Sequence, residues 1–84
     1  MTIEQFVHEI ADQMGIDLSE VSVINGDQIG FHGKNLLTIY TKDHLVKSLV
    51  NKTDIANLQN NDFCDSLEIK ILTAMSQLQV ILEE

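Results

Sequence analysis

Several residue types that would direct structure or chemistry are rare or missing in this chain. It has no proline and no arginine, and its one cysteine, Cys64, excludes a disulfide within the chain. No stretch approaches the ~18 consecutive apolar residues of a membrane-spanning helix, so we expect no membrane span. The first residues also lack the basic and apolar regions of a secretory signal. Together with the single cysteine, this predicts a cytoplasmic protein.

Positive charge is scarce and unevenly distributed. Five lysines stand against thirteen acids, which gives a net charge of −8 at pH 7. Residues 1–33 sum to −6 without a basic residue, residues 34–52 sum to +3, and residues 53–84 sum to −5. Nucleic-acid binding depends on lysine and arginine that neutralise phosphates. The charge balance therefore argues against direct contact with DNA or RNA and favours a basic protein as partner.

The length and composition predict one small folded domain. Apolar residues make up 44% of the 84 residues and charged residues 21%, which is typical of a globular chain. A chain of this size buries only about 60% of its extended surface, which leaves little material for a deep catalytic cleft. We expect residues 1–84 to form a single α+β domain.

The first element is predicted to be an amphipathic helix over residues 2–14. Thr2 and Gln5 have the spacing of a capping box, and Gly15 is a suitable stop. The apolar residues recur with a period of 3.6 and form one stripe: Ile3, Phe6, Val7, Ile10, Ala11 and Met14.

A three-stranded antiparallel meander is predicted over residues 20–41. Val21 and Val23 alternate with polar neighbours, and Asn25-Gly26 is a strong hairpin signal. Ile29 and Phe31 then alternate as a second strand, residues 32–35 form a second turn, and residues 36–41 form the third strand. A short helix is predicted over residues 42–52, capped by Thr41 or Asp43, followed by an Asn-rich loop over residues 53–62 that holds at most one helical turn.

Two structures fit the last segment, residues 66–84. A helix places most of its apolar residues in one stripe, whereas a β-hairpin is supported by alternation at residues 67–71 and 78–82. Helix-forming residues without a turn signal favour the helix, and the predicted order becomes α-β-β-β-α-α. In that helix Ile69, Leu72 and Val80 lie off the stripe, so we expect another element or a partner to cover them.

Two segments resemble acyl carrier proteins. TIEQFVHEIADQMGIDLSEVS (residues 2–22) is similar to the first helix and loop of that family, and DSLEIKIL (65–72) to the motif whose serine receives a phosphopantetheine arm. The resemblance implies that Ser66 would carry the arm. In that family, however, the motif opens the second helix, whereas here over forty residues intervene and Phe-Cys replaces the expected glycine. The alternative is that Asp65 or Ser66 caps a helix.

No pattern in the sequence predicts catalysis, a metal or a cofactor. Glu4, His8 and Asp12 share one row of the first helix, but such a row is far more often a solvated face than a metal site. We therefore predict a non-enzymatic binding domain of inhibitor, anti-host or immunity type that acts on a larger, basic protein, such as one that handles nucleic acid. The acids expected to make the contact are Glu4, Glu9, Asp12, Asp17, Glu20 and Asp27. The alternatives are a self-associating structural or regulatory subunit, such as a homodimer, and a carrier that uses Ser66.

Overall fold

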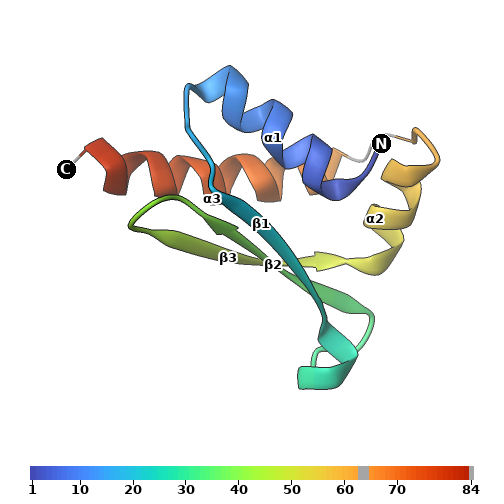
Figure 1. Ribbon diagram of the computed structural model, residues 1–84. Helices are drawn as coiled ribbons and strands as arrows, with labels where there is room; N and C mark the ends of the chain where they lie inside the picture. Colours follow the sequence, from blue (N-terminus) through green and yellow to red (C-terminus); the bar gives the residue numbers. More distant parts are fainter. Residues whose placement is uncertain (63–64, 84) are drawn as a thin grey trace.

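A computed structural model describes residues 1–62 and 65–83 of the chain. The predicted α+β fold, with the order α-β-β-β-α-α, is confirmed, and one short 3-10 helix (η1) is added between the first two strands (Figure 1). In chain order the elements are α1 (Ile3–Met14), β1 (Glu20–Asn25), η1 (Gly26–Ile29), β2 (Lys34–Tyr40), β3 (Leu45–Asn51), α2 (Lys52–Gln59) and α3 (Asp65–Glu83).

The three strands form one antiparallel sheet with the order β1-β2-β3. In its register Val23 pairs with Leu37, and Leu37 with Ser48. Helices α1 and α3 lie on the same face of the sheet, α1 against β1 and α3 against β3 (Figure 1). The hydrophobic core fills the space between this face and the two helices. Nothing among the described elements covers the opposite face.

The boundaries of α1 are as the sequence predicts. The Thr2 side chain accepts a hydrogen bond from the Gln5 backbone N–H, and the Thr2 N–H donates to Gln5 Oε1 at 3.0 Å, which completes the capping box. Gly15 ends the helix with φ of 72°, a left-handed conformation that favours glycine. The predicted stripe is buried from Ile3 to Ala11, while Met14 is half-buried against the core.

The helix predicted over residues 42–52 is wrong, because this segment forms β3. Leu45, Val46, Leu49 and Val50 fit a helical stripe, but the same two apolar pairs also suit a strand with apolar residues on both faces. Pairing with β2 settles the choice and places Val46 and Val50 in the core. The proposed cap, Thr41, instead closes the β2–β3 turn, where its hydroxyl and N–H both donate to the His44 carbonyl.

The strand predicted around Ile29 and Phe31 is also wrong. The Asn25 side chain accepts from the Asp27 N–H, and the Asp27 side chain accepts from the Gly33 N–H, so local polar contacts hold η1 and the loop after it. Gly26 is required there: a Cβ would lie 2.1 Å from the Lys34 carbonyl oxygen. The three strands therefore lie at residues 20–25, 34–40 and 45–51, not all within 20–41.

The C-terminal segment is helical, as favoured over the hairpin, and α3 runs from Asp65 to Glu83. Residues expected in a loop form the two-turn helix α2, which buries Ile55 and Leu58. Cys64 lies outside the described residues. Among those that are described, no helix is both long and apolar enough to span a bilayer.

Candidate protein-binding surface

The outer face of α3 is the most exposed apolar surface that the structure describes. Leu67, Ile71 and Leu78 point into the core and are fully buried. Opposite them, the side chains of Ile69 and Val80 are 61% and 59% exposed, and Leu72 is 37% exposed. The helix is thus apolar on both sides, which is typical of a helix that is covered on both sides.

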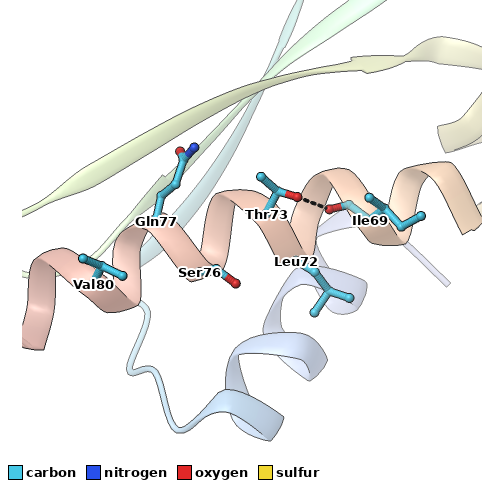
Figure 2. A pocket seen from close by; sticks show the side chains of 6 residues that line it. All are labelled: Ile69, Leu72, Thr73, Ser76, Gln77 and Val80. Carbon is cyan, nitrogen blue, oxygen red and sulfur yellow. Dashed lines mark hydrogen bonds between the residues drawn. The ribbon is translucent and has the colours of Figure 1, made fainter.

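These exposed residues line a shallow groove of about 440 Å³ along the helix (Figure 2). The lining comes entirely from α3 and consists of Ile69, Leu72, Thr73, Ser76, Gln77 and Val80. We call this set the α3 face. Figure 2 shows Gln77 and Thr73 on the side toward the sheet and Leu72 on the opposite side.

The chemistry of the α3 face suits contact with another apolar surface. None of its six residues is charged, and no acid or lysine occurs between Ile71 and Leu82 of a chain with a net charge of −8. The Thr73 hydroxyl donates to the Ile69 carbonyl at 2.8 Å, which leaves its methyl group to the surface. The six residues of the face include no acid, lysine, histidine or cysteine.

A second groove extends the α3 face to the edge of the sheet. It has a volume of about 230 Å³ and shares Ile69, Thr73 and Gln77 with the first groove. Lys47 and Ser48 of β3, together with Lys70 and Ala74 of α3, complete its lining. The uncovered surface therefore reaches from α3 onto the edge strand β3.

The open face of the sheet is a second surface with apolar residues. Register and alternation place Ile24, Leu36 and Leu49 in one row across the three strands. Ile24 and Leu45, which lies on the same face, are 41% and 47% exposed, whereas Leu36 and Leu49 are half-buried. Glu20 and Lys47 also lie on this face, so it is less exposed and more charged than the α3 face.

All six predicted contact acids are exposed, and five of them lie on α1 and the segment that follows it. Glu4, Glu9 and Asp12 are exposed along α1, Asp17 follows the helix, and Glu20 begins β1. Asp27 lies at the other end of β1, on η1, which projects away from α1 (Figure 1). The acidic surface is thus a property of α1 and the segment that joins it to the sheet.

Asp27 holds together two parts of the fold. Its carboxylate forms an ion pair with Lys52, the first residue of α2, and accepts a hydrogen bond from the Gly33 N–H at 3.1 Å. The hydrogen bond from Lys52, followed by that from Gly33, lowers the pKa of Asp27 below its usual value of 3.8. These contacts tie the loop after η1 to α2, which is a structural role.

The remaining sequence candidates are placed as follows. Ser66 is exposed in the first turn of α3. Its modification stays a prediction. Glu4, His8 and Asp12 line the exposed side of α1. Within residues 1–62 and 65–83, no group of three or more His, Cys, Asp or Glu side chains is arranged to hold a metal ion.

Sequence reasoning identified only part of the α3 face. Ile69, Leu72 and Val80 were recognisable as apolar residues off the helical stripe, and they are indeed exposed. Thr73, Ser76 and Gln77 gave no signal, because polar residues on an outer helical face are ordinary. Their significance comes from their position beside Ile69, Leu72 and Val80 in one groove, which only the folded structure shows.

No protein-family model, curated protein or solved structure matches this chain.

Proposed function

We propose that this chain is a non-enzymatic protein-binding domain that makes its principal contact through the α3 face. The observation that supports this is the exposure of Ile69 and Val80, both near 60%, in a groove whose six lining residues are all uncharged. Contiguous exposed apolar surface on a small domain marks interaction sites. Covering it with a partner would remove apolar area from water, at about 25 cal/mol per Å² before the costs of association.

The acidic surface of α1 is a second candidate contact. Glu4, Glu9, Asp12, Asp17 and Glu20 are exposed on adjoining segments, and residues 1–33 contain no basic residue. Such a surface would attract a basic protein and speed its association at low salt. This supports the inhibitor or immunity type of function, in which the acids compete with nucleic acid for a basic groove.

Affinity capture with three forms of the chain tests which surface binds. The baits are the wild type, an α3-face variant with Ile69→Lys and Val80→Lys, and a matched variant with His8→Lys and Gln13→Lys on the exposed side of α1. At pH 7 both variants add two positive charges, so they differ in location and not in net charge. We expect proteins retained by the wild type and the α1 variant to be lost from the α3-face variant.

The salt dependence separates the two candidates. Binding through the α3 face should survive raised salt, because apolar contacts are not screened, whereas binding through the acids should weaken. A set of captured proteins that is unchanged by the α3-face substitutions but released by salt would contradict the principal proposal and support the acidic surface.

A further inference from the structure

We propose that the α3 face pairs with the same face of a second copy of this chain, with the two helices antiparallel. This inference rests on the proposed function, because it names the partner of the surface described there. It is supported by the spacing of residues along α3, the distribution of charge, and the area that the face provides.

The spacing is that of a short coiled-coil seam. Ile69, Thr73, Ser76 and Val80 follow one another at intervals of four, three and four residues, and all four lie in the groove. These intervals are the same when read in either direction. In an antiparallel pair, Ile69 therefore faces Val80 of the second copy, and Thr73 faces Ser76 of the second copy, each contact occurring twice about the two-fold axis.

The side-chain sizes also suit this pairing. The two β-branched apolar residues, Ile69 and Val80, meet at both ends of the seam, and the small Thr73 and Ser76 meet at its centre. Small central residues let two helices approach closely, since the distance between helix axes depends on the side chains at the contact. With its hydroxyl bonded to the Ile69 carbonyl, Thr73 can turn its methyl group to the second copy.

The charge distribution favours a second copy over a basic partner at this face. Two copies with a net charge of −8 each repel one another wherever acids meet. The stretch from Ile71 to Leu82 is free of charge, and in the antiparallel pairing it lies opposite Ile69 of the second copy and that residue's charged neighbours, so like charges do not lie opposite each other there. A basic partner could form no ion pairs with this stretch, because it contains no acid. The acids that such a partner could pair with lie on α1 instead.

The available area predicts a dimer of moderate affinity. A 19-residue helix is about 28 Å long and about 10 Å wide, which is roughly 300 Å² in projection. A standard interface buries about 800 Å² on each partner, so two α3 helices alone fall short of it. The second groove, beside β3, extends the contact. We therefore expect a dissociation constant in the micromolar range.

Sedimentation velocity from low to high micromolar concentration tests the pairing. The wild type and the α1 variant (His8→Lys, Gln13→Lys) should shift from monomer to dimer across this range. The α3-face variant (Ile69→Lys, Val80→Lys) should dissociate at least about tenfold more readily, because lysine charges would be buried in the seam. Circular dichroism of each variant confirms that it is folded.

Two results would overturn the inference. One is a wild type that stays monomeric at every concentration. The other is a dimer that survives in the α3-face variant but is lost with Ile24→Lys and Leu45→Lys, which would place the interface on the open face of the sheet. If the chain is monomeric but its α3 face still captures a different protein, the pairing of two copies is contradicted. The proposed protein-binding function would then remain supported.

Engineered cysteines test the orientation, in a background with Cys64→Ser. Mixing Ile69→Cys protein with Val80→Cys protein under oxidation should give a disulfide-linked heterodimer. Each protein alone should not cross-link, because identical positions in the antiparallel pair lie about 16 Å apart along the helix axis, beyond the reach of a disulfide. Efficient cross-linking of each protein with itself, and not of the mixture, would contradict the antiparallel arrangement.

Discussion

Helices α1 and α3 cover the same face of the same sheet, yet their outer sides differ completely. Both bury an apolar stripe in one shared core. The outer side of α1 carries Glu4, Glu9 and Asp12, whereas the outer side of α3 presents Ile69, Leu72 and Val80. Because both helices pack against the same core, the difference lies in their outer sides. We propose that the acids of α1 remain in contact with water, whereas the α3 face contacts another protein surface.

The largest effect is expected from truncating the inner side of α3. Leu78 is fully buried, so Leu78→Ala should lower the free energy of unfolding by about 2–5 kcal/mol through lost contacts and a cavity. Val80→Ala, two residues further on the outer side, should change it by no more than about 0.5 kcal/mol in the monomer. Urea unfolding at a concentration that keeps the chain monomeric measures both. Equal losses would show that Val80 is packed as Leu78 is.

A smaller loss is expected at the start of α1. Thr2→Ala removes the acceptor for the Gln5 N–H and should cost about 1 kcal/mol. The dimer should persist, because the capping box lies outside the α3 face. Urea unfolding and sedimentation of the same variant measure the two effects. Loss of the dimer with an intact fold would show that α1 takes part in the interface.

Neutralising the outer side of α1 should have little effect. Glu9→Gln together with Asp12→Asn changes the net charge from −8 to −6, and both residues are exposed. At physiological salt we expect the dissociation constant of the dimer to change by less than about threefold, because exposed charges beyond the Debye length are screened. Sedimentation at low and at physiological salt tests this. A dimer abolished by these changes would mean that the acids form the contact.

The smallest effect is expected at Asp27, away from both helices' outer sides. Its pKa in the folded chain is lowered, so its ion pair contributes stability above the unfolded value of 3.8, and this is lost as the pH falls through the folded pKa. Asp27→Asn should lower the melting temperature at pH 6 and leave it closer to that of the wild type at strongly acidic pH. Asp12→Asn is the matched control. A deficit that stays constant with pH would show that the ion pair does not stabilise the fold.

Local signals in the sequence predicted the elements whose ends are set locally. The capping box at Thr2 and Gln5, the stop at Gly15 and the 3.6-residue stripe all identify α1, because each depends on residues within a few positions of one another. The same reasoning failed for residues 42–52. There the paired residues Leu45-Val46 and Leu49-Val50 fit a helix and a strand equally well, and hydrogen bonding to β2, which the sequence does not show, chose the strand.

The candidate site was also predicted only in part from the sequence. The sequence supplied the acids of residues 1–33 and the three apolar residues off the α3 stripe. It did not show that Asp27 would be separated from the other acids by the length of β1 and paired with Lys52, 25 positions along the chain. Contacts between distant residues depend on the sheet register, which one chain's periodicity leaves open.

The sequence by itself determined the α+β class, the first helix, the acidic character of the chain and the absence of charge between Ile71 and Leu82. Each follows from composition or from spacing within a few residues. Only the tertiary structure decided that residues 45–51 are a strand, that α3 lies against β3, and that one side of α3 stays uncovered. Those outcomes depend on which apolar faces pack together, and packing is settled between elements far apart in the chain.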